Sequence, residues 1–233
     1  MDQLFPHTFS AVRRRLGLPE AGDPSRKRSI VQVCRSDESD LCHDLLSVYG
    51  FTEEQMHRAA ERFHLGRSKS GKAIYWMIDE LGRCLDARIG DSWFSAMLKV
   101  RYPFAAPYLQ TAHCLFGLHQ ISRHEQMPVG IVESERSAVI LSEVQPQLLW
   151  LAYSYASNCT VDRFEPLQGR KVTFFPRTDP AREIYFSFLE LADQVKRLYR
   201  NIDISVSTFL DDRASEAQKA RCIDLVDFLF EST

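Results

Sequence analysis

Two carboxylates in the C-terminal half of the sequence follow predicted strands at positions where they could hold a metal ion. Glu133 ends the apolar run Val129–Val132 directly before a predicted helix, and Asp179 follows the run Lys171–Phe175. In an open parallel sheet, ligands bind beyond the carboxyl ends of the strands. Carboxylates there suit Mg²⁺, which takes one or two of them and keeps several waters. Acidic residues after strands are more often helix caps and turn formers, so the spacing leaves both interpretations open.

The segment Gly66–Ala73 matches a phosphate-binding P-loop at every position except the last. Ala73 has no hydroxyl for Mg²⁺, which a P-loop supplies at that position. The predicted order is also reversed, because a P-loop follows a strand and opens a helix, whereas this segment follows a helix and leads into a strand. Both departures favour a solvated basic turn over a nucleotide-hydrolysing site.

The six cysteines and seven histidines do not show metal-site spacing. There is no CxxC pair, and the neighbours His113 and Cys114, or Cys42 and His43, lack a third ligand at a suitable distance along the chain. We therefore predict reduced thiols, mostly in the core, in a cytoplasmic protein.

The first half of the sequence predicts short helices and a hairpin. Leu41, Leu45 and Val48 share one face of a first helix, and Thr52 with Gln55 forms a capping box for a second. Two aromatic and β-branched runs joined by a glycine-containing turn predict a β-hairpin. These runs, and a helix expected after them, are Ala73–Asp79, Cys84–Ile89 and Trp93–Val100.

From Val129 onward, short apolar strands alternate with amphipathic helices, which is typical of a mostly parallel α/β sheet. The strands are expected at Val129–Val132, Leu148–Ala152, Lys171–Phe175 and Ile202–Phe209, and the helices near Ser134–Val144, Ala181–Arg200 and Ala214–Phe230. The longest helix carries an apolar stripe at helical spacing that predicts burial against the sheet. Its residues are Ile184, Phe188, Leu191, Val195 and Leu198.

Charge and composition divide the chain into three parts. We expect a basic, flexible arm at residues 1–29, a small α+β region at 30–125 and an α/β domain at 126–233. Residues 1–35 carry seven basic and three acidic side chains, a net charge of +4. Because the whole chain has a net charge of −2, the remaining residues sum to −6. Such an arm either contacts phosphates or is simply solvated. No apolar run approaches the roughly 20 residues that span a bilayer, so membrane insertion is not expected.

Several motifs in the right order resemble a Toprim domain of primase type. They are Cys114–Leu118, Pro128–Ala138 and Leu167–Pro176, and the hairpin Tyr75–Asp79 and the final segment Asp224–Leu229 also match. More closely, the chain resembles uncharacterised Toprim-like, primase-related proteins of bacterial mobile elements and plasmids. The resemblance implies a Toprim-like, mostly parallel sheet flanked by helices, preceded by a small α+β region similar to part of a primase core.

The resemblance also implies a chemistry and partners. In Toprim domains a glutamate after the first strand moves a proton in nucleotidyl or phosphodiester transfer, and an acidic D-x-D pair holds Mg²⁺. By match, Glu133 is the catalytic residue and a metal ligand, and Asp179 is a second ligand for Mg²⁺ or Mn²⁺. Asp211 and Asp212, after the last predicted strand, either supply replacement ligands or form a turn. The implied partners are DNA, especially single-stranded DNA, and a replication helicase or a mobilisation protein.

Three departures from the family pattern open an alternative function. Arg177 stands where the first aspartate of the pair is expected, the run from Tyr153 to Ala156 stands where relatives tend to have a glycine-containing turn, and no cysteine-rich zinc module precedes the domain. Exchanging a carboxylate for a guanidinium changes the local charge by +2, which weakens Mg²⁺ binding. Arg177 could instead pair with Asp179 or hold a phosphate. The chain is then either an Mg²⁺-dependent, primase-like enzyme or a module that binds nucleic acid through Arg177, Arg136 and the arm residues Arg13, Arg14 and Arg15.

Overall fold

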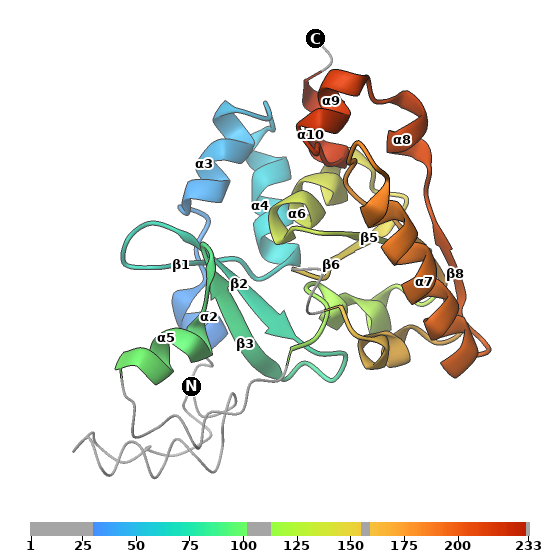
Figure 1. The fold of residues 1–233 in the computed structure, drawn as a ribbon. Helices are drawn as coiled ribbons and strands as arrows, with labels where there is room; N and C mark the ends of the chain where they lie inside the picture. The colour runs from blue at the N-terminus through green and yellow to red at the C-terminus, as the bar shows by residue number, and fades with distance from the viewer. Residues whose placement is uncertain (1–29, 102–112, 155–158, 232–233) are drawn as a thin grey trace. The chain divides into compact units, whose positions relative to one another are not determined.

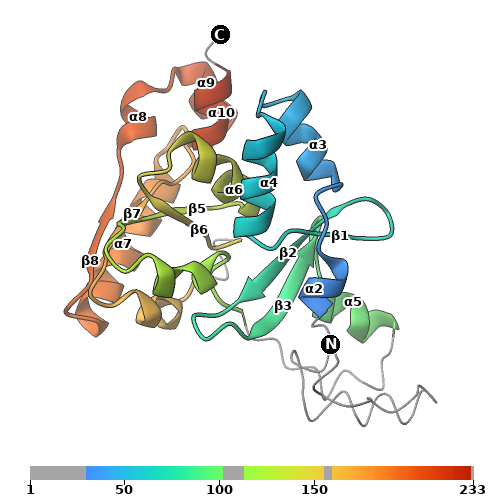
Figure 2. The same cartoon turned by 180° about the vertical axis from the view of Figure 1, so that it is seen from behind.

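The computed structural model describes residues 30–101, 113–154 and 159–231 (Figure 1). The chain divides into two compact units, one ending at Cys114 and the other beginning at Leu115. Each unit contains its own four-stranded sheet, visible from both sides in Figures 1 and 2. The expected domain limits at residues 29 and 125 stay predictions, and residues 1–29 lie outside the described part of the chain.

The N-terminal unit is built on an antiparallel sheet in the order β1-β2-β3-β4. Its strands are β1 (Gly66–Arg67), β2 (Ala73–Ile78), β3 (Cys84–Ile89) and β4 (Ser92–Trp93). Its helices are α2 (Ile30–Cys34), α3 (Asp40–Ser47), α4 (Glu53–Arg62) and α5 (Phe94–Arg101). The predicted hairpin is therefore confirmed as β2 and β3.

Local capping sets the start of α4, the second of the helices that the sequence predicted in this unit. Thr52 and Gln55 form the expected capping box at the start of α4, with both reciprocal hydrogen bonds present. Helix α3 buries Leu41 and Leu45, but Val48 is exposed, contrary to expectation. Val48 is the C-cap of α3, so its side chain lies past the last turn of the buried face.

The P-loop-like segment lies in a hairpin between two strands. Gly66 pairs with Ile74 across β1 and β2, and the amide of Ser68 donates to the carbonyl of Lys72 at 2.9 Å. No helix begins after this turn, because Ala73 starts β2. The fold therefore supports the interpretation of this segment as a turn between strands rather than a nucleotide-hydrolysing P-loop.

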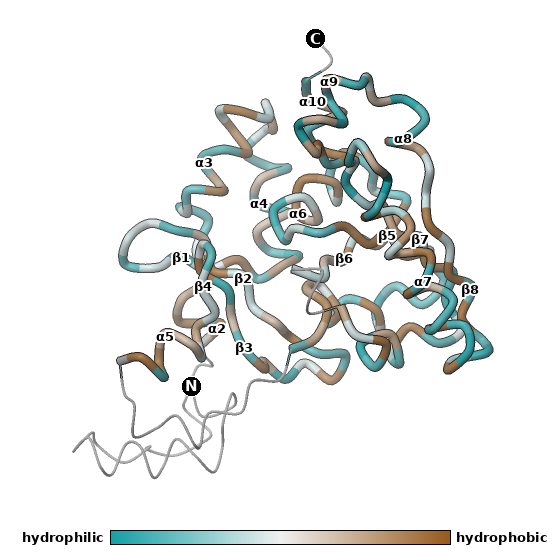
Figure 3. Tube along the Cα trace, in the orientation of Figure 1, coloured by the Kyte–Doolittle hydropathy of each residue, from teal (hydrophilic) through white to brown (hydrophobic). Residues whose placement is uncertain are grey.

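The C-terminal unit confirms the predicted α/β class. Its sheet has the order β6-β5-β7-β8, and every pairing is parallel. Its strands are β5 (Val129–Val132), β6 (Leu149–Ala152), β7 (Lys171–Phe174) and β8 (Asp203–Val206). Helix α6 (Glu135–Val144) packs along β5 and β6, and α7 (Glu183–Leu198) packs along β8. Figure 3 shows hydrophobic residues concentrated along β5 and β6, which are buried throughout.

Shorter elements complete this unit. The 3₁₀ helices η3 (Leu118–Arg123) and η5 (Val161–Leu167) precede β5 and β7. Helices α8 (Phe209–Arg213), α9 (Glu216–Ala220) and α10 (Leu225–Phe230) follow β8 and group at one end of the unit (Figures 1 and 2). Since they follow the last strand of a parallel sheet, this is the end where the strands finish. Among the described residues, no helix combines the length and apolarity needed to cross a bilayer.

Gly130 permits the central strand to approach a buried tryptophan. A Cβ atom on Gly130 would lie 2.7 Å from ring atom Cζ3 of Trp150 on the adjacent strand β6. Trp150 is buried, and its indole nitrogen donates to the carbonyl of Gln145 at 2.9 Å, which fixes the ring. No residue with a side-chain carbon fits at position 130 without displacing that ring.

Three predictions for the C-terminal unit are wrong in detail. The last strand ends at Val206, three residues early, since α8 begins at Phe209. The single helix expected at 214–230 is two helices, because Cys222 adopts a left-handed φ of 53° between them. Leu198, expected in the buried stripe of α7, is exposed at the last turn of the helix.

Candidate functional site

The candidate site is the carboxyl edge of the parallel sheet, defined here by the residues that directly follow β5, β6 and β7. Backbone hydrogen bonds hold these segments together. The amide of Ser154, after β6, donates to the carbonyl of Glu133 at 2.9 Å, and the amide of Phe175, after β7, donates to the carbonyl of Ile131 at 2.8 Å. Residues that are far apart in the sequence are therefore brought to one edge, as predicted for strands of a parallel sheet.

Arg177 contacts Glu133 at this edge. Its Nε lies 3.3 Å from Glu133 Oε2, and the side chains are 44% and 25% exposed. The neighbouring Thr178 is fully buried, and its amide and hydroxyl both donate to the carbonyl of Ile223, at 2.9 and 3.3 Å. This anchoring fixes the backbone beside Arg177, so a guanidinium is positioned to neutralise Glu133. The partner of Arg177 is thus Glu133 rather than Asp179.

Asp179 caps the start of helix α7 from outside it, since the N-cap residue is Arg182 and the Asp179 side chain accepts the free amides. Its Oδ1 accepts hydrogen bonds from the amides of Ala181 and Glu183, and its Oδ2 accepts from the amide of Ile184, all at 3.0 Å. The side chain is nearly buried, and its charge lies at the positive end of the helix dipole. The sequence left two roles open for Asp179, a helix cap and a metal ligand. In the structure its side chain forms the hydrogen bonds of a cap.

The other predicted site residues lie on helices α6 and α8 or outside the described residues. Asp211 Oδ2 pairs with Arg182 Nε at 3.1 Å, and Asp212 Oδ2 accepts from the Thr208 hydroxyl at 2.7 Å. Arg136 is exposed in the first turn of α6. The arm residues Arg13, Arg14 and Arg15 precede residue 30, where the description of the chain starts.

An Mg²⁺ cradle made of Glu133 and Asp179 does not fit this arrangement. Mg²⁺ requires oxygen ligands in near-octahedral geometry at about 2.0–2.1 Å. Both oxygens of Asp179 already accept backbone amides, and Glu133 faces a guanidinium. In the described ranges, no three His, Cys, Asp or Glu side chains gather in a metal-binding group. The metal-ligand roles of these residues stay predictions from the sequence resemblance.

Tyr153 and Ser154 shape the edge and were not predicted as site residues. Tyr153 is buried, and its burial, followed by the nearby charge of Glu133, raises the pKa of the phenol above its usual value. Ser154 has a left-handed φ of 71°, and its hydroxyl donates to Oε1 of buried Glu135 at 2.6 Å. The family resemblance carried a signal for this backbone, because it implies a glycine-containing turn at this position. Ser154 adopts the left-handed conformation that glycine favours.

A second hydrogen-bond chain links the start of α6 to the start of α10. Ser134 caps α6, and its hydroxyl donates to the hydroxyl of Ser137 at 2.8 Å. Ser137 in turn donates to Asp224 Oδ2 at 2.5 Å, while Asp224 caps α10 through the amide of Asp227. The C-terminal helix is thereby tied to the helix that follows Glu133.

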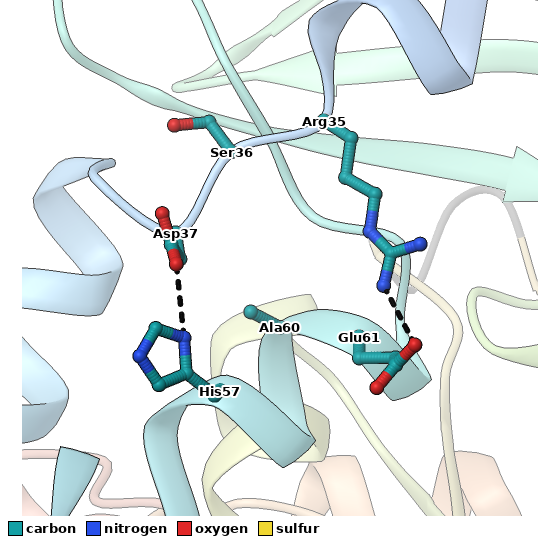
Figure 4. Close-up of a pocket in the computed structure, with 6 residues that line it drawn as sticks. All are labelled: Arg35, Ser36, Asp37, His57, Ala60 and Glu61. Atoms are coloured by element: carbon teal, nitrogen blue, oxygen red, sulfur yellow. Dashed lines mark ion pairs between the residues drawn. The ribbon is translucent and has the colours of Figure 1, made fainter. Parts of the chain in front are cut away.

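A polar pocket of about 280 Å³ lies in the N-terminal unit between helix α4 and the segment before α3 (Figure 4). Arg35 Nη2 lies 3.1 Å from Glu61 Oε1, and His57 Nδ1 lies 2.9 Å from Asp37 Oδ2, with Ala60 between the two pairs. All four side chains are exposed, and pairs of this kind contribute at most about 1 kcal/mol. We interpret the pairs as braces between the segment and α4.

Solved structures of primase catalytic domains share this fold. A structure of the DnaG primase catalytic domain bound to ssDNA matches with a TM-score of 0.53 at 15% identity, over 97% of this chain and 82% of that chain. The DnaG catalytic core matches with a TM-score of 0.51, and the E. coli primase catalytic core with 0.50. Both are 16% identical and cover 87% of this chain and 81% of theirs. At these identities the likeness shows the fold.

The sequence comparisons give a family without an assigned activity. No curated protein matches the sequence. Residues 39–178, more than half of the chain, match a family described as a domain of unknown function, DUF6371. The matched region includes Glu133, Tyr153 and Arg177, so the carboxyl edge lies inside it. The chain belongs to the DUF6371 family.

Proposed function

We propose that this chain is a primase-like protein that binds single-stranded DNA, with Arg177 holding a backbone phosphate at the carboxyl edge. The contact between Arg177 and Glu133 at 3.3 Å carries the proposal, because a cation stands where a metal-binding aspartate was expected. Nε of Arg177 faces Glu133, and no other hydrogen bond or ion pair of Arg177 exists within the described ranges. The terminal nitrogens can therefore bind a phosphate in a bidentate manner. The likeness to a primase domain bound to ssDNA supports DNA as the ligand.

Glu133 regulates this phosphate site in the proposal, because it competes with the phosphate for the same guanidinium. Arg136, exposed one turn away from the edge on α6, adds a second cation for the backbone. Arg13, Arg14 and Arg15 would extend the contact to further phosphates through counterion release. Affinity should then depend steeply on salt and should not require a divalent cation.

Two matched substitutions test the proposal on the full chain with oligo(dT) as the probe. Glu133→Gln removes the competing charge, and we expect affinity to rise about fivefold, since a unit charge about 4 Å away contributes roughly 1 kcal/mol in water. Arg177→Gln should lower affinity and reduce the slope of log affinity against log salt by about 0.7–1, the share of one phosphate contact. Both effects should persist in EDTA.

Glu190→Gln and Arg197→Gln, on the exposed side of α7, are the charge-matched controls. They change net charge by the same amount as the site variants but lie on the solvent face of a helix. Equal effects of Arg177→Gln and Arg197→Gln would mean that only net charge matters, and the phosphate role of Arg177 would be refuted. A drop in affinity for Glu133→Gln would likewise contradict competition between Glu133 and the phosphate.

The second candidate function is Mg²⁺-dependent nucleotidyl transfer with Glu133 moving the proton. The position of Glu133 favours it, since this partly exposed carboxylate follows the central strand of a primase-like sheet. Catalysis would require Arg177 to leave Glu133. Primer synthesis on single-stranded DNA with Mg²⁺ or Mn²⁺ separates the candidates: a catalytic Glu133 predicts activity that Glu133→Gln abolishes, whereas the binding function predicts tighter binding and no primer product.

The link to bacterial mobile elements is a further proposal that rests on the sequence resemblance alone. The same is true of a replication helicase or a mobilisation protein as partner. Co-purification of the full chain with such proteins from a cell that carries a conjugative plasmid would test it.

A further inference from the structure

An arginine and two aromatic rings lie together at the start of helix α7. Arg182 is the N-cap residue, with a left-handed φ of 58°, and Tyr185 and Phe186 lie in the first turn. The guanidinium carbon of Arg182 lies 4.8 Å from the centre of the Tyr185 ring and 5.8 Å from that of Phe186. The two rings meet edge to face at 5.7 Å. Phe186 is 54% exposed, so much of its ring faces solvent.

A second stack lies on α8, which an ion pair ties to α7. Arg182 Nε contacts Asp211 Oδ2 at 3.1 Å, and the Asp211 side chain is largely buried. On α8, the guanidinium carbon of Arg213 lies 4.3 Å from the centre of the Phe209 ring. Arg213 is exposed, and it forms no ion pair within the part of the chain that the structure describes. Arg182, Tyr185, Phe186, Phe209 and Arg213 are called the stacking surface below.

Core packing does not account for Phe186. The buried residues of α7 are Phe188, Ala192 and Val195, which face the sheet side of an amphipathic helix, and Phe186 lies on the other side. The surface around it is also held in place before any ligand arrives. Asp179 fixes the first turn of α7, and the pair between Arg182 and Asp211 fixes the guanidinium. Rigid, exposed rings and guanidinium planes are the groups on which unpaired bases stack.

Charge distinguishes this surface from the phosphate site. The two arginines of the stacking surface lie beside the two carboxylates Asp211 and Asp212, so its net charge is near zero. A neutral aromatic surface suits base faces better than phosphates. The loop from Arg177 to Arg182 connects the two, and it is anchored through Thr178 and Asp179.

We propose that the stacking surface binds the bases of single-stranded nucleic acid whose backbone is held at Arg177. This inference rests on the proposed function and adds the part of the ligand that the α7 and α8 residues would recognise. It requires that bases, and not only the sugar-phosphate backbone, contribute to affinity.

The experiment measures binding of oligo(dT) and of an abasic oligonucleotide of the same length to the full chain, over a range of salt concentrations. Phe186→Ala should lower oligo(dT) affinity between about fivefold and a hundredfold, the range for loss of one base–aromatic stack. Binding of the abasic strand and the salt slope should not change. Phe186→Trp should retain or strengthen oligo(dT) binding. Leu198→Ala, which removes an exposed apolar side chain from the same helix, is the matched control and should have no effect.

Any other result would contradict either base stacking or the phosphate site at Arg177. Equal affinity of the native chain for oligo(dT) and the abasic strand would overturn base stacking and leave the phosphate site intact. Equal losses of both ligands in Phe186→Ala would also overturn it, since stacking cannot involve an abasic strand. Failure of the native chain to bind either ligand would refute the proposed function itself. Concentration-dependent self-association that Phe186→Ala abolishes would assign the surface to a second copy of the chain instead.

Discussion

Replacing Asp179 tests whether this residue acts as a helix cap or as a metal ligand. In Asp179→Ala, two backbone amides of the first turn of α7 and the amide of Ala181 before it lose acceptors that now lie at 3.0 Å, in a nearly buried position. Loss of a side-chain cap costs about 0.5–2 kcal/mol, and a hydrogen bond to a charged group contributes about 1.5–3 kcal/mol. Water replaces part of these bonds, so we expect a loss of about 3 kcal/mol. For a chain of this size that corresponds to a decrease in Tm of about 6–12 °C.

The assay is thermal and urea unfolding followed by far-UV circular dichroism, in EDTA and in Mg²⁺. Asp179→Asn keeps one acceptor oxygen and should lose about half as much stability as Asp179→Ala. Asp193→Ala, on the exposed side of the same helix, is the control and should change little. The reasoning is refuted if Asp179→Ala is as stable as the native chain in EDTA but loses a stabilisation that the native chain gains from Mg²⁺. That pattern would identify Asp179 as a metal ligand.

Two further predictions concern the C-terminal unit. Gly130→Ala should lower the free energy of unfolding by about 1–3 kcal/mol, because its Cβ would meet the Trp150 ring at 2.7 Å. The loss should be smaller in a Trp150→Leu background. Equal losses in both backgrounds, measured by urea unfolding, would contradict the clash. Burial raises the pKa of Asp227, so the folded state binds that proton more tightly. The folded state therefore loses stability as pH rises from the pKa of the unfolded chain through the raised pKa. Asp227→Asn should therefore gain stability relative to the native chain across that window, and a difference independent of pH would contradict the shift.

The fold could be predicted where the sequence pattern is local and strong. The bounds of β5 were predicted residue for residue, because an apolar run ends at Glu133 and Ser134 begins a helix as its cap. The split between α9 and α10 was missed although both capping boxes, at Ser215 and at Asp224, can be read from the sequence. The apolar periodicity through residues 214–230 was given more weight than those caps, and the left-handed Cys222 leaves no trace in hydropathy.

The candidate site shows the same division between local and distant information. The amide partners of Asp179 lie within five residues of it, so an acidic residue before Pro180 and an amphipathic run already indicates a helix start. The partner of Glu133 is distant in the sequence, and the two meet because β5 and β7 are neighbours with Ile131 opposite Phe174. The sequence shows that Arg177 stands where an aspartate was expected. Its contact with Glu133 follows only from the order of the strands in the sheet. Because the pair depends on register, a shift of β7 by one residue would separate Arg177 from Glu133.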